Sequence, residues 1–343
     1  MSRSSRLFLA ALLGCGLVCG PVAPARAAEP DKLLPAETET VVYVNLKQVL
    51  ASEVVKKFAL DQVKQALEGQ DVKKLLADMG LDPLKDVDSI WVGMSGPLPK
   101  KKGNDEKPAD QEETKALIVV HGRFDPEKLF KAAEAAAKKD GETFSMIKEG
   151  GVVMFKYQPE DQNPIYATVV DEKTIVAGSD RKLVNTALKQ AKEDKKSPVK
   201  AELADLLKPV DDKVSVFVAG LVKGKFDDLQ IPAEVPLNLG ALEKVLTKAE
   251  TLTVAVRMTA DVGVEVGFGM KDADAATDMA DAVEKLLKDV TGLIQVAGAF
   301  DPKIKPLADV VKSATTDVNK KTVVIKVKLT GDVIGELLKQ DGD

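Results

Sequence analysis

The chain of 343 residues holds 54 acidic and 49 basic side chains, mixed along its length, and only 4% of its residues are aromatic. Such a surface argues against nucleic acid as a partner, and so few aromatic rings leave little to build a stacking platform for bases or sugars. One histidine and two cysteines exclude metal sites that need paired histidines.

The first 27 residues have the layout of a signal peptide. Arg3 and Arg6 precede an apolar run over residues 7–18, and residues 25–27 offer a small-residue cleavage site. The run is shorter than the about 20 apolar residues that a membrane-spanning helix needs. We therefore predict an exported, periplasmic or extracellular protein without a transmembrane helix, whose net charge falls from -5 to about -8 on cleavage.

Both cysteines of the chain, Cys15 and Cys19, lie inside this leader. The mature chain is therefore expected to have no disulfide, no thiolate nucleophile and no cysteine-ligated metal. An alternative stays open, because residues 12–15 loosely resemble a lipoprotein cleavage box that would keep Cys15 as a lipid anchor. Cleavage after Ala27 is the preferred prediction.

The first half of the mature chain begins with a strand over residues 41–46, where side chains alternate between two faces. Ser52 then caps a helix predicted to end near Gly69. The polar, proline-rich segment 97–114 buries too little to order itself and is predicted to be a flexible insertion in a hairpin. The other expected elements, in order, are a helix at 71–80, strands at 90–94 and 116–123, a helix at 126–139, strands at 144–147, 152–157, 165–170 and 174–177, and a helix at 180–192.

A polar stretch at residues 193–198 marks a boundary, after which a similar order of elements begins again. The most distinct element of this half is a long helix over residues 273–296 with one apolar stripe. The other expected elements, in order, are a strand at 214–219, a helix at 239–249, strands at 252–258 and 262–270, a helix after Asp301, a hairpin across Asn319 and Lys320, a strand at 323–329, and a helix from Asp332.

Each half thus gives strand, helix, strand, strand, helix, strand, the order of a ferredoxin-like βαββαβ unit. We predict an α+β protein of two tandem ferredoxin-like units, residues 28–196 and 197–343, with mainly antiparallel sheets and helices on one face. The match in order suggests an internal repeat. Because short α+β units often fall into this order by chance, an independent origin of the two halves stays open.

The sequence offers little for catalysis. His121, the only histidine, lies near a strand end without a serine motif, and we expect it to be structural or exposed. No Gly-x-Ser-x-Gly elbow occurs, and serine–lysine pairs are too frequent to be specific. Gly267-Phe268-Gly269 lacks the third glycine of a dinucleotide fingerprint, and the glycines on this strand face predict close packing there instead. We therefore predict no catalytic residue and no cofactor.

The densest acidic group is Asp272, Asp274 and Asp278, with Asp281 beyond it. Clustered carboxylates suit calcium, but Ala276 stands where an EF-hand loop needs a further oxygen ligand. Acidic residues at the start of a helix also cap its free amides and favour its dipole. Capping is the preferred interpretation, and a calcium site formed by these aspartates is the alternative.

Residues 34–46, Leu-Pro-Ala-Glu-Thr-Glu-Thr-Val-Val-Tyr-Val-Asn-Leu, followed by Val49-Leu50 and Val54-Val55-Lys56-Lys57, are similar to the opening of uncharacterised secreted bacterial proteins. In those proteins a leader precedes a Leu-Pro-Ala-acidic-Thr motif and a strand that ends in Val-Asn. The resemblance covers about the first fifth of the mature chain. It implies an exported α+β protein and carries over no functional residue.

We interpret the sequence as that of an exported, non-enzymatic protein of the cell envelope with a binding or scaffolding role and an unidentified envelope partner. Buried-face patterns throughout, without convergent polar residues, favour this hypothesis. One alternative is an envelope hydrolase that uses two carboxylates or a serine–lysine pair, which requires facing carboxyl groups, one with a raised pKa. Another alternative is a carrier for lipid or another apolar ligand between sheet and helices.

Overall fold

The computed structural model describes residues 29–96, 114–139, 141–149, 152–158, 163–193, 195–227, 237 and 239–339. The predicted leader and all but the last residue of the predicted insertion at 97–114 lie outside the described residues. The chain divides into two compact units. We call residues 27–50 and 61–210 the N-terminal unit, and residues 51–60 and 211–343 the C-terminal unit.

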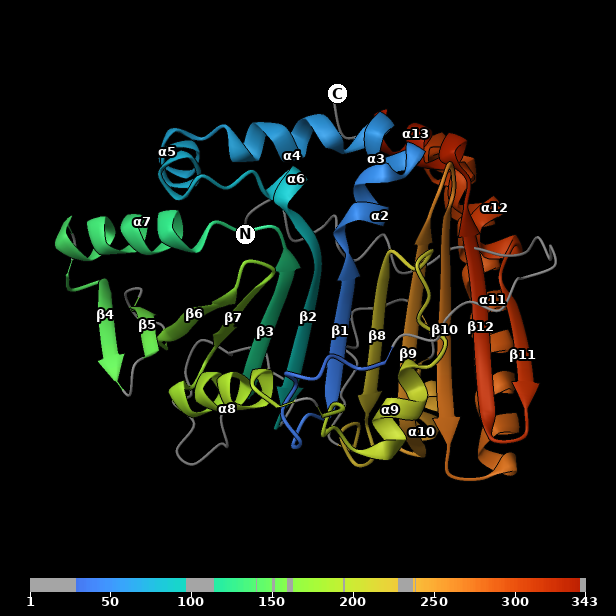
Figure 1. The fold of residues 1–343 in the computed structure, drawn as a ribbon. Coiled ribbons are helices and arrows are strands. Elements are labelled where there is room, and N and C mark those ends of the chain that lie inside the picture. Colours follow the sequence, from blue (N-terminus) through green and yellow to red (C-terminus); the bar gives the residue numbers. More distant parts are fainter. Residues whose placement is uncertain are drawn as a thin grey trace. The chain divides into compact units, whose positions relative to one another are not determined.

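The N-terminal unit contains seven of the described strands, and each pairs antiparallel with its neighbours (Figure 1). Two meanders meet where β3 pairs with β7, with Val119 opposite Val176. In spatial order the strands are β1 (Thr40–Asn45), β2 (Val87–Ser95), β3 (Lys115–Gly122), β7 (Thr174–Gly178), β6 (Ile165–Asp171), β5 (Val152–Tyr157) and β4 (Phe144–Glu149).

Helices cover both faces of this seven-stranded region. On one face Leu117, Val119 and Val176 are fully buried, and Val184 of α8 packs there beside Gly178. On the other face Leu129 of α7 packs in a cluster with Val87 and Phe124. The helices met in this part of the chain are α2 (Leu46–Ala51), α4 (Leu60–Leu67), α5 (Gln70–Met79), α6 (Pro83–Asp86), α7 (Pro126–Lys139), α8 (Arg181–Ala191) and α9 (Ala201–Leu207).

The segment before β1 is anchored within the N-terminal unit. Leu34 is fully buried, and a Cβ added at Gly93 of β2 would come within 2.9 Å of its Cδ2. Gln190 of α8 donates from Nε2 to the carbonyl oxygens of Lys32 and Leu34, at 3.2 and 3.3 Å. The residues of the Leu-Pro-Ala-acidic-Thr motif therefore fix how the chain enters its first strand, because Gly93 leaves room for the leucine.

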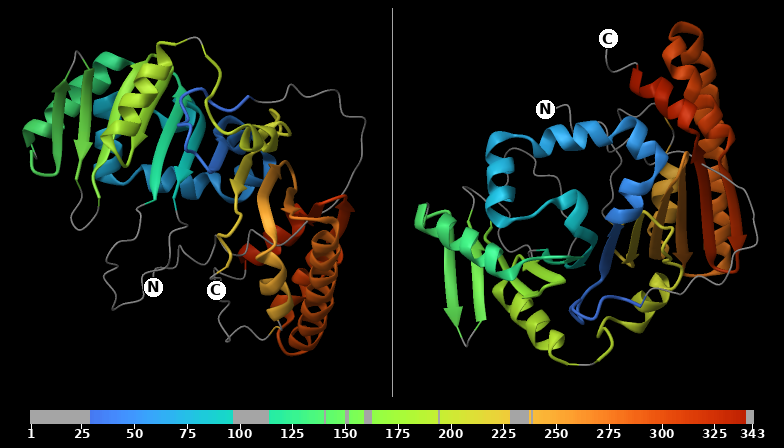
Figure 2. Two further views of the ribbon diagram at one scale, coloured as in Figure 1. Left: turned by 90° about the horizontal axis from the view of Figure 1, so that it is seen from below. Right: turned by 45° about the horizontal axis from the view of Figure 1, so that its top comes forward.

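The C-terminal unit contains five antiparallel strands, which adjoin one another in the order β11 (Thr315–Asn319), β12 (Thr322–Leu329), β10 (Val262–Met270), β9 (Ala249–Met258) and β8 (Val216–Leu221). Its helices are α3 (Glu53–Phe58), α10 (Gly240–Leu246), α11 (Ala273–Phe300), the 3-10 helix η2 (Pro302–Ile304), α12 (Lys305–Lys312) and α13 (Gly331–Lys339). The long helix α11 runs beside the strands of this unit (Figure 2).

The core of the C-terminal unit lies between α10, α11 and one face of its strands. Met279 and Ala276 of α11 are fully buried, and they pack with Met270 of β10 and Val323 of β12. These α11 residues belong to the apolar stripe that the sequence predicts. Asp272 caps the start of the helix, and its Oδ1 accepts a hydrogen bond from the Ala275 amide at 2.8 Å.

The α+β class is confirmed, but the prediction of two tandem ferredoxin-like units is wrong. In a ferredoxin-like unit, two strands that are joined by a helix are separated in the sheet by a further strand. In this chain β1 pairs directly with β2, and β8 pairs directly with β9, although helices connect them in the sequence. The two units also contain seven and five of the described strands, and helices cover both faces of the N-terminal unit. The linear order of elements is compatible with several pairings, since a strand alternates its side chains in the same way beside any neighbour.

The single helix predicted from Ser52 to Gly69 is also wrong. Ser52 does cap α3, its Oγ accepting from the Val55 amide at 3.4 Å, but α3 ends at Phe58. Ala59 leaves helical geometry with φ -127°, and α4 begins at Leu60. The α3 segment belongs to the C-terminal unit, where the Val54 amide donates to the Thr259 carbonyl at 2.9 Å. Tertiary packing thus splits into two helices a segment whose apolar periodicity predicts one.

Candidate functional site

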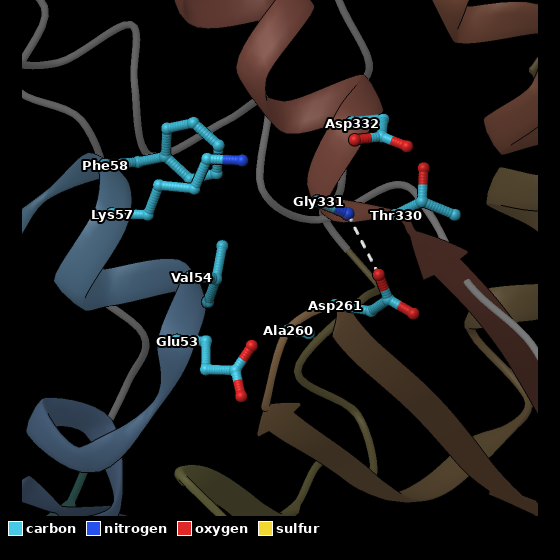
Figure 3. A pocket seen from close by; sticks show the side chains of 9 residues that line it. All are labelled: Glu53, Val54, Lys57, Phe58, Ala260, Asp261, Thr330, Gly331 and Asp332. Carbon is cyan, nitrogen blue, oxygen red and sulfur yellow. Dashed lines mark hydrogen bonds between the residues drawn. The ribbon is translucent and has the colours of Figure 1, made fainter.

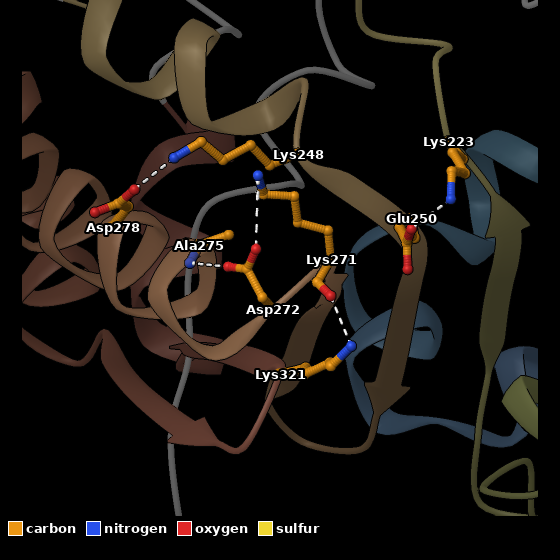
Figure 4. Close-up of polar contacts among 8 residues, drawn as sticks. All are labelled: Lys223, Lys248, Glu250, Lys271, Asp272, Ala275, Asp278 and Lys321. Atoms are coloured by element: carbon orange, nitrogen blue, oxygen red, sulfur yellow. Dashed lines mark hydrogen bonds and ion pairs between the residues drawn. The ribbon is translucent and has the colours of Figure 1, made fainter.

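Lysines already engage the acidic cluster that the sequence offers as a calcium candidate (Figure 4). Lys248 Nζ lies 2.6 Å from Asp278 Oδ2, and Lys271 Nζ lies 3.5 Å from Asp272 Oδ2. The hydrogen bond from the Ala275 amide holds the pKa of Asp272 below its usual value. Within the described residues, no group of three or more acidic or histidine side chains could hold a metal ion. These contacts favour capping.

A second ion pair lies beside this cluster, where Lys223 Nζ contacts Glu250 Oε1 at 2.7 Å (Figure 4). Lys321 Nζ donates to the carbonyl oxygen of Lys271 at 2.6 Å. The hydrogen bond from Lys223 lowers the pKa of Glu250. Both lysines are exposed to solvent, so these contacts contribute little to stability.

His121 forms an ion pair with a side chain of the segment before β1. Its Nε2 pairs with Asp31 Oδ2, while Asp31 Oδ1 accepts from the Leu33 amide at 2.8 Å. Burial by itself lowers the pKa of His121, but the hydrogen bond and negative charge of Asp31, with a smaller effect of Asp171, outweigh burial and raise it. The histidine therefore fastens the segment before β1 to the sheet, which accounts for its position without a catalytic role.

The glycines of β10 are explained by their neighbours on β9. A Cβ added at Gly267 would collide with Oγ1 of Thr253, and one added at Gly269 would collide with Oγ1 of Thr251. The threonine side chains thus occupy the space that the missing side chains leave. Phe268 points to the opposite face and packs against the core between sheet and α11. Nothing in this arrangement resembles a phosphate-binding turn.

A polar pocket of about 210 Å³ lies in the C-terminal unit between α3 and the start of α13 (Figure 3). Asp261 at its edge accepts from the Gly331 amide at 2.9 Å and pairs with Lys328 at 2.8 Å. The Lys328 contact, with the amide, lowers the pKa of Asp261. A carboxylic acid for hydrolysis needs a raised pKa. Asp261, by contrast, is a bound carboxylate that ties the β9–β10 turn to α13.

A larger groove of about 520 Å³ opens where α11, the end of α12 and β11 meet. Its helical wall combines apolar, small and polar side chains, and Glu284 and Lys288 within it pair with each other at 3.7 Å. The groove therefore presents no unbalanced charge. The residues that line it are Glu284, Leu287, Lys288, Thr291, Gly292, Gln295, Val311, Ala314 and Thr316.

Thr316 contributes an unusual polar atom to this region. Its hydroxyl oxygen is buried and has no hydrogen-bond partner among the described residues, and the same is true of Thr315. A buried hydroxyl without a partner destabilises a fold by roughly 1–3 kcal/mol. Unsatisfied groups in a native structure often mark a site that completes its bonding with something else.

The opposite flank of α11 carries an exposed apolar stripe formed by Leu293, Val296 and Phe300, whose exposed fractions are 40, 64 and 86%. At 100° per residue these side chains lie on the far side of the helix from Leu287 and Thr291 of the groove. The predicted helix ends at residue 296, whereas α11 continues to Phe300. The sequence signal for this surface is the absence of any charged residue between Asp289 and Asp301.

Sequence patterning did not single out the groove. Ala314 and Thr316 lie at the start of a strand and Thr291 and Gln295 on a helix, and none of them belongs to a sequence motif. They converge only because α11 lies along the terminal strand of the unit. None of the sequence-proposed site residues lines this groove.

No protein-family model matches the chain, and no curated protein matches it in sequence. Among solved structures it is similar to one described as "Structure of crystal form I of TP0453", with a TM-score of 0.42 and 7% sequence identity. That alignment covers 91% of this chain and 97% of the other. A similarity at this level carries no information on function. In the described part of the chain no helix combines the length and apolar character needed to cross a membrane.

Proposed function

We propose that this chain is an exported, non-enzymatic binding protein of the cell envelope, and that it holds a protein partner in the groove between α11 and β11. One observation carries the proposal, namely a groove of about 520 Å³ beside a strand that pairs on one side only among the described strands. Concave sites with a mixed apolar and polar lining are typical of binding sites. The leader pattern of residues 1–27 supports export.

The lining favours a polypeptide over a lipid. Gln295 places a polar side chain along the groove and the Glu284–Lys288 pair borders it, whereas the Thr291 hydroxyl already donates to the Leu287 carbonyl at 2.7 Å. A hydrocarbon chain would remove these groups from water without giving them hydrogen bonds. A peptide segment supplies amide donors and acceptors for them.

Site-specific photo-crosslinking in the producing bacterium tests the proposal. A photoreactive amino acid replaces Gln295 in the groove or, as the matched control, Val296, which is exposed on the opposite flank of the same helix. We expect an adduct with another protein from position 295 and not from position 296. Mass spectrometry of the adduct identifies its partner peptides.

Other adducts would overturn the proposal. A lipid adduct at position 295 would make the protein a lipid carrier, and an adduct containing only peptides of this chain would mean self-association. An adduct that forms solely at position 296 would assign binding to the exposed apolar stripe instead.

The export part has its own test. N-terminal sequencing of the protein recovered from the producing bacterium should start at Ala28. A chain that begins with a lipid-modified Cys15 would support the lipoprotein alternative, and an intact Met1 would contradict export.

A further inference from the structure

The terminal strand of the C-terminal unit has one backbone edge without a partner strand among the described residues. β11 pairs only with β12, with Thr315 opposite Lys326, Asp317 opposite Val324, and Asn319 opposite Thr322. A two-residue loop joins the strands, and Lys320 in it has the positive φ, 55°, that the first position of such hairpin turns requires.

This register decides which backbone groups face outward. In a hairpin with a two-residue loop, the residues that flank the loop form a hydrogen-bonded pair, and bonded pairs then recur at every second residue. Asn319, Asp317 and Thr315 therefore bond to β12. The amide and carbonyl groups of Thr316 and Val318 point away from β12. Consistently, the Lys328 amide of β12 points to the β11 side and donates to Ser313 Oγ at 3.2 Å.

The groove begins at this edge. Thr316 and Val318 stand opposite Ile325 and Val323, which face the core side of the sheet, so their side chains lie on the side of α11. Thr316 lines the groove, and Val318 is 46% exposed. An added strand lies about 4.7–4.9 Å from its neighbour and sends alternate side chains to each face. Here one set of side chains would enter the groove against Leu287 and Thr291.

Natural proteins block open strand edges with lysine, proline or a bulge, or cover them. β11 contains neither lysine nor proline, and its pairing with β12 has no register shift. Its only charged side chain, Asp317, pairs with Lys326 at 2.9 Å on the face away from the groove. Uncovered backbone groups therefore coincide with the groove and with the unpartnered hydroxyl of Thr316.

We infer that the partner inserts an extended segment with alternating apolar side chains, which adds a strand to the free edge of β11 and fills the α11 groove. This inference rests on the proposed function and names the kind of partner for the same site. Strand addition derives affinity from main-chain hydrogen bonds and specificity from the pockets for alternate side chains. The balanced Glu284–Lys288 pair favours a segment that is uncharged where it enters the groove.

A synthetic peptide with the sequence of residues 322–329 serves as the probe, because it alternates Val323, Ile325 and Val327 with Thr322, Val324 and two lysines. Its binding to the purified mature chain is measured by fluorescence anisotropy. Val318→Pro removes one outward amide from an edge position that tolerates proline, and Val318→Ala, which keeps the amide, is its matched control. Gly292→Leu fills the groove, and Gly292→Ala, whose added Cβ meets nothing within 4 Å, is its matched control.

We expect Val318→Pro and Gly292→Leu to weaken peptide binding by about tenfold or more, because each removes hydrogen bonds or packing on the order of 1.4 kcal/mol. Val318→Ala and Gly292→Ala should leave the affinity within about twofold of the unchanged chain. Hydrogen exchange at the Thr316 and Val318 amides should slow when the peptide binds. No peptide binding, equal binding to Val318→Pro, or unchanged exchange at both amides would overturn strand addition.

The same variants separate this inference from the proposed function. A crosslink from position 295 that Gly292→Leu abolishes but Val318→Pro preserves would leave the groove as a protein-binding site and refute strand addition. Loss of the crosslink in both variants, together with peptide binding, supports both. Peptide binding without any crosslink in the bacterium would refute the proposed function alone.

Discussion

The terminal strands of the two units differ in how they are covered. β4 of the N-terminal unit carries the exposed Lys148 and packs under α7, and a cavity beside Ile147 measures about 10 Å³. β11 of the C-terminal unit lacks such a lysine and borders a groove of about 520 Å³. The cavity beside the terminal strand is thus much smaller in the N-terminal unit than in the C-terminal unit. The difference supports the proposal that the partner binds to the C-terminal unit.

The largest effect on stability is expected in the N-terminal unit, where Leu34 anchors the segment before β1. Leu34→Ala should lower the free energy of unfolding by about 2–5 kcal/mol, because it opens a cavity at a fully buried leucine packed beside Gly93. Chemical denaturation of the mature chain measures the change. A loss below about 0.5 kcal/mol, the range of surface substitutions, would show that this segment is not part of the core.

Glycine-to-alanine substitutions should change the free energy of unfolding in opposite directions in the two units. The larger change is expected at Gly122 of the N-terminal unit. In Gly122→Ala the new Cβ collides with the backbone carbonyl of Asp86, which cannot move freely because it accepts from the Arg123 amide at 2.7 Å. We expect a loss of about 1–3 kcal/mol. Denaturation of the variant measures it, and an unchanged or raised stability would contradict the packing described at this site.

Thr316→Val should stabilise the unliganded protein by about 1 kcal/mol, because it replaces a buried hydroxyl without a partner by a methyl group of the same shape. Thr168→Val is the matched control, since the Thr168 hydroxyl donates to the Val153 carbonyl at 2.7 Å and is buried in the N-terminal unit. That substitution should destabilise. Paired thermal and urea unfolding measures both changes, and equal signs for the two would refute the contrast.

Gly292→Ala should stabilise the chain by about 0.5–1 kcal/mol, because alanine favours a helix and the added Cβ meets nothing within 4 Å. Gly122→Ala and Gly292→Ala add the same methyl group, the first at a crowded position and the second at an open one, so the pair compares the packing at the two sites. Urea denaturation provides the measurement. A destabilised Gly292→Ala chain would mean that the groove wall is already filled.

The smallest effect concerns pH. The folded pKa of His121 lies above 6.5, so the stability gained from the His121–Asp31 pair is fully present below the unfolded pKa and is lost as pH rises through the folded pKa. The stability difference between the unchanged chain and His121→Gln should therefore be larger at pH 6 than at pH 9. Urea denaturation at both values tests the sign, and a difference that grows with pH would contradict it.

The sequence predicted many helices and strands of the fold but not how the strands pair or how the elements pack together. The alternation at residues 41–46 and the stripe of residues 273–296 correspond to β1 and α11. The helix from Ser52 was predicted too long, because the division at Ala59 follows from packing in the C-terminal unit. The sequence suggested the acidic cluster at Asp272 as a candidate site but not the groove. Gln295 and Thr316 are far apart in the sequence, and only the fold brings them together.

The sequence by itself determined the leader pattern, the absence of cysteine beyond it, and the local periods that make strands and helices. Only the tertiary structure decided that β3 pairs with β7, that β11 pairs on one side only among the described strands, and that α11 forms a groove beside its other edge. The physical reason is one of range. Backbone and side-chain preferences act between near neighbours in the chain, whereas strand pairing and grooves depend on contacts between residues far apart in sequence.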